Sequence, residues 1–313
     1  MRRKIVALLG GLLVVLVVVS AFYELNKGVP TASTATGRIK VLASFYLVYE
    51  FANNVGGNRI DLSLLVPKTD DVHSFEPRPS SILNVATANV LIYSGVGLEP
   101  WIPQVIAAAD NPRLIVVDSS QGIPLLPVPP RFQKDNRAFD PHIWLDPVLA
   151  KQQVMNILQG LIRADPANEG YFTSNAQAYT MKLDTLNSEI LQSTRNVKTR
   201  YFITFHEAFA YFAERYNLTQ TPIAGPFQED PTPSDIQGVI SAIRQNHLCY
   251  VGYESLENPS ISESIASQSH ATLVLMDPIE GLSQADQAAG KTYLIKMQDN
   301  LAVFVLALNH ADC

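Results

Sequence analysis

Short apolar runs and amphipathic stretches alternate along the first half of the chain. Apolar runs of strand length occur four times: Ile39–Ala43, Leu62–Val66, Val90–Tyr93 and Leu114–Val117. Stretches with helical spacing of apolar positions lie between and after them: Tyr46–Val55, Ser80–Ala86, Pro100–Ala108 and Pro147–Ile162. Such alternation is typical of a parallel sheet covered by helices. We therefore predict an α/β lobe over residues 39–164.

A single long helix is predicted after this lobe. Asp165 and Pro166 form a helix start, because aspartate caps a helix and proline suits its first turn. The apolar positions that follow are spaced by four and three residues in turn: Phe172, Ala176, Tyr179, Leu183, Leu186 and Ile190. One stripe of this length is short for a coiled coil. We therefore expect a connecting helix over residues 165–198.

The alternation returns in the last third of the chain. Three apolar runs predict strands: Tyr201–Phe205, Cys249–Tyr253 and Leu273–Met276. Three amphipathic stretches predict helices: Ser234–Asn246, Ser260–Ser269 and Lys291–Leu308. This pattern indicates a second α/β lobe over residues 199–313. The predicted fold class is thus α/β, with two parallel-sheet lobes and one long helix between them.

The N-terminus has the pattern of an export signal. Arg2, Arg3 and Lys4 precede Ile5–Tyr23, which carries no charged residue. That run is long enough to cross a bilayer, and no cleavage site of the A-x-A type follows it, so an uncleaved anchor is favoured over a cleaved signal. We assign residues 1–25 to the signal or anchor and residues 26–38 to a linker. The basic residues predict that the remainder is extracytoplasmic, anchored to the membrane or secreted.

Charge and cysteine content narrow the classes of function. Without Arg2, Arg3 and Lys4 the chain has 20 basic and 29 acidic residues, a net charge of −9. This balance excludes a typical nucleic-acid-binding protein. The chain has two cysteines, Cys249 and Cys313. An even number in an exported protein favours one disulfide over two free thiols.

Four candidate metal ligands follow predicted strands or the proline-rich loop at residues 122–141. His73 comes after the strand ending at Val66, His206 directly follows Tyr201–Phe205, and Asp277 directly follows Leu273–Met276. His142 follows the proline-rich loop. Parallel sheets bind ligands at the carboxyl ends of their strands, so a cleft between the lobes could collect all four side chains.

Three imidazoles and a carboxylate suit a transition metal such as zinc, whereas calcium and magnesium prefer oxygen ligands. A single histidine after a strand is more often a surface or hydrogen-bonded residue, so the metal site is predicted only because the four candidates occur together. The histidines beside predicted helices are interpreted as ordinary surface residues: His247, His270 and His310.

The chain resembles the cluster A-I, or cluster 9, zinc- and manganese-binding receptors of ABC importers. Four segments carry the resemblance: Val72–Ser80, Asp140–Pro147, Phe202–Tyr216 and Met276–Pro278. It extends over residues 39–313 and implies two α/β lobes joined by a rigid helix, with the metal between them. It also implies that the ligands are His73, His142, His206 and Asp277.

The resemblance carries expectations about cargo and partners. Zinc-importing members commonly have histidine at position 206 and manganese-importing members have glutamate, so we expect zinc as the transported ligand, with manganese as the alternative. The expected partners are the divalent metal ion and an ABC transporter permease, and the receptor is expected to be a monomer. Many zinc receptors have a histidine-rich loop before the second ligand, which residues 122–139 lack. Cys249 and Cys313 match the position of the family's disulfide.

Two other functions were weighed. A zinc-dependent hydrolase would need an open coordination position and a general base. His206-Glu207 begins like the H-E-x-x-H motif, but Ala210 occupies the place of its second histidine. We therefore expect no enzyme activity. A surface adhesin or interaction protein remains a second alternative.

Overall fold

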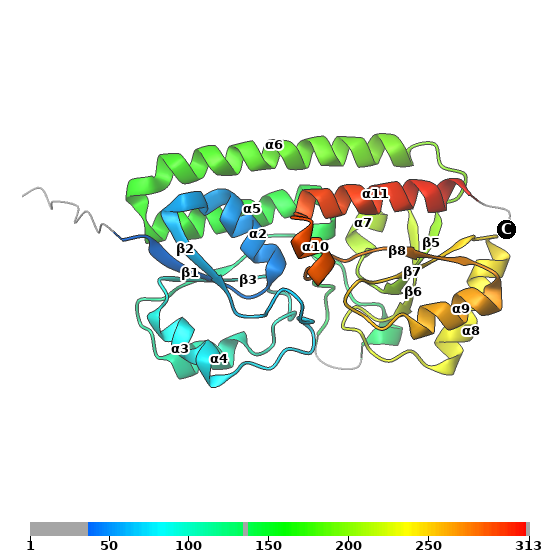
Figure 1. Cartoon of the computed structure of the whole chain (residues 1–313), viewed down its shortest axis with the longest axis horizontal. Helices are drawn as coiled ribbons and strands as arrows, with labels where there is room; N and C mark the ends of the chain where they lie inside the picture. The colour runs from blue at the N-terminus through cyan, green and yellow to red at the C-terminus, as the bar shows by residue number, and fades with distance from the viewer. Residues whose placement is uncertain (1–36, 134–136, 311–313) are drawn as a thin grey trace, which may run out of the picture. The chain divides into compact units, whose positions relative to one another are not determined.

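A computed structural model describes residues 37–133 and 137–310 of the chain (Figure 1). From Ile39 onward, the described residues form one compact unit. Within the described residues, none of the helices has the length and apolar character needed to cross a membrane. The proposed signal or anchor, Ile5–Tyr23, lies outside the described residues.

The first lobe is built on a four-stranded parallel sheet. Its strands are β1 (Ile39–Ala43), β2 (Ile60–Leu64), β3 (Val90–Tyr93) and β4 (Ile115–Asp118), in the order β2-β1-β3-β4. The central strands β1 and β3 are largely buried, as expected for a sheet covered on both faces. Strand β2 begins two residues earlier than the apolar run Leu62–Val66 predicted, because its outward positions are polar.

Helices cover both faces of this sheet (Figure 1). On one face lie α2 (Tyr46–Gly56) and α5 (Pro147–Ala164), which contact the strands directly. On the other lie α3 (Pro79–Thr87) and α4 (Ile102–Ala109). Asp146 caps α5 by accepting the Val148 N–H, so the helix begins where the sequence predicted.

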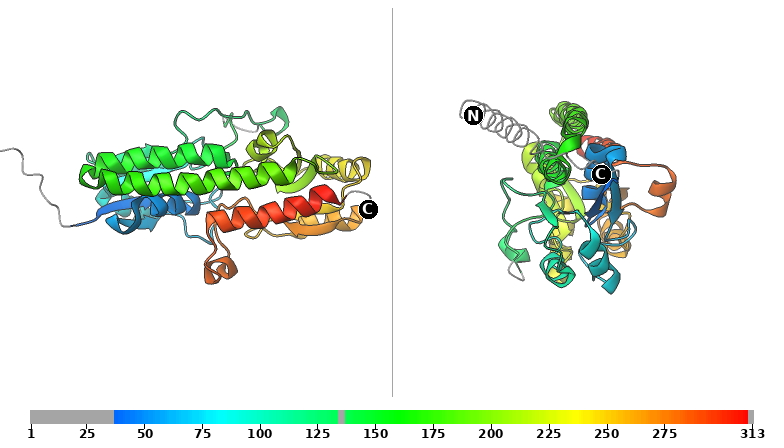
Figure 2. Two further views of the ribbon diagram at one scale, coloured as in Figure 1. Left: turned by 90° about the horizontal axis from the view of Figure 1, so that it is seen from above. Right: turned by 90° about the vertical axis from the view of Figure 1, so that its left-hand side faces the viewer.

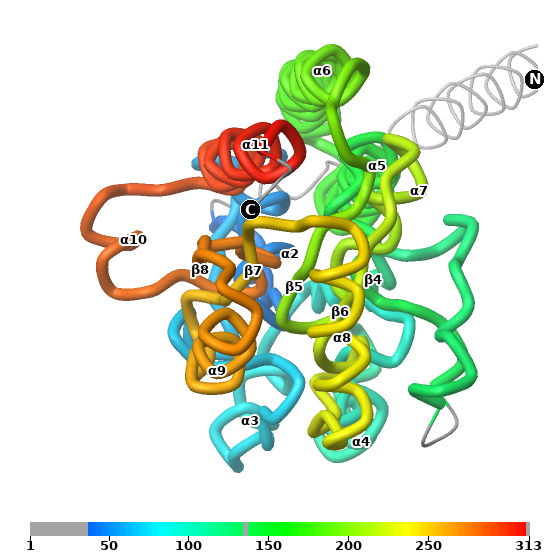
Figure 3. Tube along the Cα trace, turned by 90° about the vertical axis from the view of Figure 1, so that its right-hand side faces the viewer, coloured from blue at the N-terminus to red at the C-terminus, as the bar shows by residue number. Residues whose placement is uncertain are grey.

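The second lobe contains two parallel strand pairs. Strand β5 (Tyr201–His206) pairs with β6 (Thr219–Ala224), and β7 (Tyr250–Tyr253) pairs with β8 (Thr272–Leu275). Figure 3 shows α8 (Pro233–Gln245) and α9 (Ser260–Ser269) on one side of these strands and α11 (Tyr293–Asn309) on the other. Two short helices, α7 (Ala210–Arg215) and α10 (Gln284–Ala288), complete the lobe.

Helix α6 (Glu169–Thr194) connects the lobes. Its 26 residues would span about 39 Å at the α-helical rise. The helix packs on α2 and α5 in the first lobe and on α11 in the second (Figure 2). All members of the apolar stripe predicted from the sequence are buried: Phe172, Ala176, Tyr179, Leu183, Leu186 and Ile190. The predicted fold class, two parallel-sheet lobes with one long helix between them, is confirmed.

One cysteine of the predicted disulfide is described. Cys249 is buried beside the start of β7 and is disulfide-bonded. Cys313, its expected partner, lies outside the described residues, so the pairing stays a prediction.

Candidate metal centre between the lobes

Four side chains converge between the lobes, two from each. His73 lies in the loop between β2 and α3, and His142 immediately precedes the short 3-10 helix Ile143–Leu145. His206 is the last residue of β5, and Glu280 lies in the loop that follows β8. His206 and His142 are therefore placed by the end of a strand and the start of a 3-10 helix, whereas His73 and Glu280 are placed by loops.

One nitrogen or oxygen atom from each of these four side chains lies close to those of the other three. Oε1 of Glu280 lies 2.9 Å from Nε2 of His73, 3.0 Å from Nε2 of His142 and 3.4 Å from Nε2 of His206. The Nε2 atoms of His142 and His206 are 3.1 Å apart. One potential ligand atom from each residue lies within 4.8 Å of all the others. Three imidazoles and one carboxylate so close together are a donor set that suits a zinc ion.

Two of the imidazoles have a carboxylate next to Nδ1, the ring nitrogen that faces away from the cluster. Asp140 Oδ1 lies 2.8 Å from Nδ1 of His142 and also accepts the His142 backbone N–H. Glu254 Oε1 lies 2.7 Å from Nδ1 of His206. With a proton on Nδ1 shared with the carboxylate, the lone pair of Nε2 points into the cluster, which is the arrangement that metal-binding histidines adopt.

His73 is held differently. Its ring Nδ1 is buried and has no hydrogen-bond partner. Its position is fixed through its backbone N–H, which Asp71 Oδ1 accepts at 2.9 Å, and by edge-on contact of its ring with Phe227. The His73 ring is therefore oriented by its loop and by packing.

The charges of the four groups depend strongly on one another. Burial lowers the pKa of His206, but the carboxylates of Glu254 and Glu280 outweigh it and raise that pKa well above its usual value. Burial also lowers the pKa of His142, but Asp140 and Glu280 outweigh burial and raise that pKa above its usual value. Burial raises the pKa of Glu280, yet His73 and His206 bring it well below its usual range. The buried carboxylates beside His142 and His206 thus favour the protonated form of these two imidazoles.

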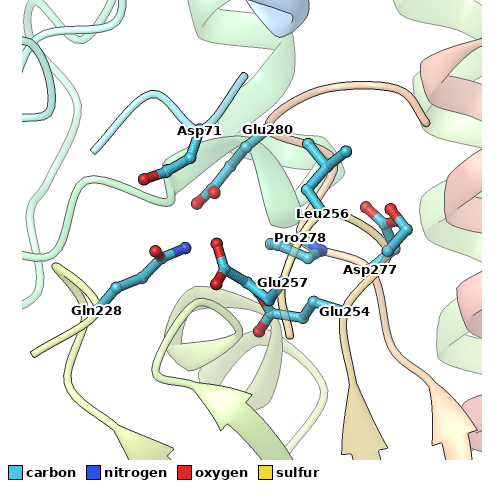
Figure 4. A pocket seen from close by; sticks show the side chains of 9 residues that line it. Asp71, Gln228, Glu254, Leu256, Glu257, Asp277, Pro278 and Glu280 are labelled. Carbon is cyan, nitrogen blue, oxygen red and sulfur yellow. The ribbon is translucent and has the colours of Figure 1, made fainter. Parts of the chain in front are cut away.

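The structure places Asp277, one of the four expected ligands, outside the cluster. Its carboxylate does not reach the cluster; it forms a buried ion pair with Lys296, with Oδ2 2.6 Å from Nζ. Oδ2 also accepts the Ser255 hydroxyl at 2.5 Å, and Oδ1 accepts the Ile279 N–H at 2.7 Å. Figure 4 shows Asp277 on the far side of Pro278 from Glu280. The carboxylate of the cluster therefore comes from three residues farther along the same loop.

A small cavity lined mainly by carboxylates lies beside the cluster and shares Glu280 with it. Glu254, Glu257, Asp71 and Gln228 also line it (Figure 4). Burial, together with the neighbouring carboxylates of Asp71, Glu254 and Glu280, raises the pKa of Glu257 to about 7. The carboxylates gathered around this cavity favour a cation over an anion.

Comparison with known proteins agrees with this geometry. A family described as zinc-uptake complex component A, periplasmic (ZnuA) matches residues 41–307. The chain belongs to this family. Its description names an uptake component and an extracytoplasmic compartment, and the ZnuA family consists of solute-binding receptors and not enzymes.

Three relatives illustrate the family. The high-affinity zinc uptake system protein ZnuA of Bacillus subtilis is 29% identical over 281 residues, which cover 87% of this chain and 88% of that protein. The crystal structure of the Zn(II)-bound ZnuA-like domain of Streptococcus pneumoniae AdcA has a TM-score of 0.76 at 25% identity, covering 88% of this chain and 100% of that one. The laminin-binding protein Lmb of Streptococcus agalactiae gives 0.77 at 28%, covering 87% and 100%.

The sequence predicted three of the four converging side chains but not the fourth, Glu280. It also did not predict the carboxylates that contact His206 and His142, which are Glu254 and Asp140. Glu254 directly follows β7, and Asp140 stands two residues before His142. A carboxylate at a strand end or two residues from a candidate ligand is the signal that could have pointed to both of these residues.

Proposed function

We propose that this protein is an extracytoplasmic receptor that captures a divalent transition metal, with zinc preferred, and delivers it to an ABC importer permease. The observation that carries the proposal is the convergence of three imidazole nitrogens and the Glu280 carboxylate between the lobes. We infer that His73, His142, His206 and Glu280 are the ligands. Four protein ligands would fill a tetrahedral coordination sphere, as capture requires and hydrolysis does not.

Zinc is favoured over manganese by the donor set. Imidazole nitrogens suit zinc, whereas manganese is better served by carboxylate and water oxygens. The relatives support the same choice: ZnuA of Bacillus subtilis is named a zinc uptake protein, and the AdcA domain was crystallised with Zn(II). Manganese remains the alternative cargo.

The organisation of the chain fits delivery at a membrane surface. We propose that residues 1–25 direct export and anchor the chain, that residues 26–38 form a tether, and that the receptor acts as a monomer. Lobes over residues 39–164 and 199–313, with the connecting segment 165–198 between them, would present the metal to the permease from one cleft.

The proposal is tested by metal analysis of the purified extracytoplasmic chain. We expect one zinc ion per chain, retained against a chelator in competitive titration, and a much weaker affinity for manganese. A chain that binds no zinc, or binds manganese as tightly, would contradict the proposed cargo. If deletion of the gene prevents growth in medium with little zinc, and added zinc restores growth, then zinc binding is connected to zinc uptake.

An adhesin role is the second candidate. It rests on the similarity to Lmb, whose structure is described as that of a bifunctional protein with adhesin and metal transporting activity. Binding of the purified chain to immobilised laminin, measured with and without zinc, tests it separately from metal capture.

A further inference from the structure

A lysine is buried behind the loop that carries Glu280. Lys296, on α11, has only 2% of its surface exposed. Its Nζ lies 2.6 Å from Oδ2 of Asp277 and 2.9 Å from Oδ2 of Asp286. A buried ammonium is costly unless it is paired, and here two carboxylates from different segments pair with it. Lys296 therefore ties the segment after β8 to α10 and α11.

Asp277 is fixed on every side. Its backbone N–H donates to Oδ1 of Asn300 at 2.9 Å, and its carbonyl accepts from Nδ2 of Asn300 at 2.7 Å. Its side chain accepts from Lys296, Ser255 and the Ile279 N–H. Because Ile279 precedes Glu280 directly, the orientation of the Asp277 carboxylate determines where the backbone next to Glu280 lies.

That backbone adopts an unfavourable conformation. Ile279 is fully buried and has a φ of +63°, in the left-handed region that a β-branched residue rarely occupies. Such a residue persists only where its surroundings hold it. The surroundings here are the hydrogen bond from Ile279 to Asp277 and the bond from the Trp144 indole to the Pro278 carbonyl, at 2.7 Å.

We propose that Lys296 is a positioning residue for the metal site, acting through Asp277 to hold the turn at Ile279 that points Glu280 at the three histidines. The inference rests on the proposed function, because it assigns Lys296 a part in holding the fourth ligand. The same ion pair keeps the Asp277 carboxylate out of the cleft. Lys296 thus determines which of two carboxylates in one loop faces the metal.

The matched comparison is between two lysines of the same region. Lys296→Met removes the ammonium that orients Asp277 and keeps a side chain of similar length. Lys291→Met removes a half-exposed lysine that pairs with Asp299 and approaches Asp286 at 3.9 Å, without contacting Asp277. Both variants are made in the full extracytoplasmic chain, and thermal unfolding of the metal-free form checks that each is folded.

Two readouts separate positioning of Glu280 from a general loss of stability. The first is the visible absorption spectrum of the cobalt(II)-loaded protein, whose d–d bands report coordination number and geometry. The second is the zinc dissociation rate, measured by transfer to a chelator. We expect Lys296→Met to change the cobalt spectrum in the same way as Glu280→Gln and to weaken zinc binding about 10–100-fold, the usual effect of losing an outer partner of a ligand. Lys291→Met should match the wild type in both.

Asp277→Asn is the second variant, and it decides the matter if Lys296→Met does not fold. The amide has the shape of the carboxylate but cannot accept from both Lys296 and the Ile279 N–H. It should give the same altered cobalt spectrum and faster zinc release. If a folded Lys296→Met has the wild-type spectrum and zinc release rate, the inference is wrong. If Lys296→Met does not fold, the same result in Asp277→Asn would overturn it. In either case, zinc binding by the wild type would still support the proposed function. A wild type that binds no zinc would instead refute the proposed function itself.

Discussion

In the candidate site, some side chains point into the cluster, where they could bind a metal, and others orient those side chains. His142 and His206 each have a carboxylate at 2.8 Å or less on the ring nitrogen that faces away from the cluster. Such outer partners fix the ring and increase its basicity. His73 has none, so its contribution depends on the loop that carries it.

Removal of one imidazole should abolish most zinc binding. His206→Ala leaves two imidazoles and one carboxylate, and we expect a loss in zinc affinity greater than the roughly 10–100-fold that loss of an outer partner costs. His310→Ala is the control, because His310 is exposed after α11, and its ring contacts the carbonyl of Leu306 and packs edge-on to Tyr250, away from the cluster. Competitive titration of both variants is the measurement, and wild-type affinity in His206→Ala would remove the basis of the assigned site.

The raised pKa values predict a pH dependence of zinc affinity. Zinc binds neutral imidazole, so it must displace any proton on Nε2. The carboxylates raise the pKa of His206 and His142 above the ordinary 6.5. Zinc affinity should therefore decrease as the pH falls, and the decrease should begin above pH 6.5. Titrations between pH 8 and pH 5.5 measure it.

Glu254→Gln provides the control for this pH dependence. Loss of the Glu254 charge removes a cause that raises the pKa of His206, so the fall in affinity should move to lower pH. A wild-type affinity that stays constant down to pH 6.5 would contradict the assignment of the raised pKa to these groups.

Residue by residue, the sequence predicted nitrogen donors better than oxygen donors. Histidines are few, and three of them follow strand ends or the proline-rich loop, so position alone selected them. Carboxylates are common, and Asp277 and Glu280 lie three residues apart in one loop. Which of them reaches the cluster depends on Lys296, 16 residues beyond Glu280, and on the φ of Ile279. The spacing of residues in the sequence does not show which of the two carboxylates reaches the cluster.

Among the elements, α6 makes the strongest stability prediction. Leu183 on its buried stripe is fully buried, whereas Met181 two residues earlier is 64% exposed. Leu183→Ala should destabilise the metal-free protein by about 2–5 kcal/mol, because it leaves a cavity. Met181→Ala should change the stability by less than about 0.5 kcal/mol. Urea unfolding measures both, and equal effects would contradict the packing of α6.

Elements with strong periodicity were predicted well, and those whose stability depends on tertiary contacts were not. The stripe of α6 and the buried strands β1 and β3 follow directly from the spacing of their apolar residues. Strand β6 was missed because its sequence, with Pro222 and three polar residues at its start, has a weak strand pattern. It forms because it pairs with β5. The short helix α10 was missed for a similar reason, since only five residues form it.

At the scale of the whole molecule, the disulfide is predicted to stabilise the second lobe. Closure of the chain between Cys249 and Cys313 should contribute about 4 kcal/mol in the chain-entropy model. Reduction should therefore lower the unfolding temperature of the metal-free protein, while Cys249→Ser should make it insensitive to reductant. Thiol titration of the denatured, unreduced chain checks the pairing, and two free thiols would disprove it.

The lobes meet at the candidate site, so the metal should stabilise their contact. The loop after β8 belongs to the second lobe, yet the Pro278 carbonyl accepts from the Trp144 indole and the Leu282 N–H donates to the carbonyl of Lys68, and both Trp144 and Lys68 lie in the first lobe. A Cβ at Gly281 would lie 2.3 Å from that carbonyl, so only glycine allows this approach. Glu280 is thus presented where the two lobes are already in contact.

Binding of one zinc ion by three imidazoles and one carboxylate between the lobes can be measured directly. X-ray absorption at the zinc edge of the stoichiometrically loaded protein tests it most directly. We expect a four-coordinate ion with nitrogen and oxygen neighbours at about 2.0–2.2 Å and the outer-shell scattering of three imidazole rings. A shell containing sulfur, or one made of oxygen with fewer than three imidazoles, would contradict it.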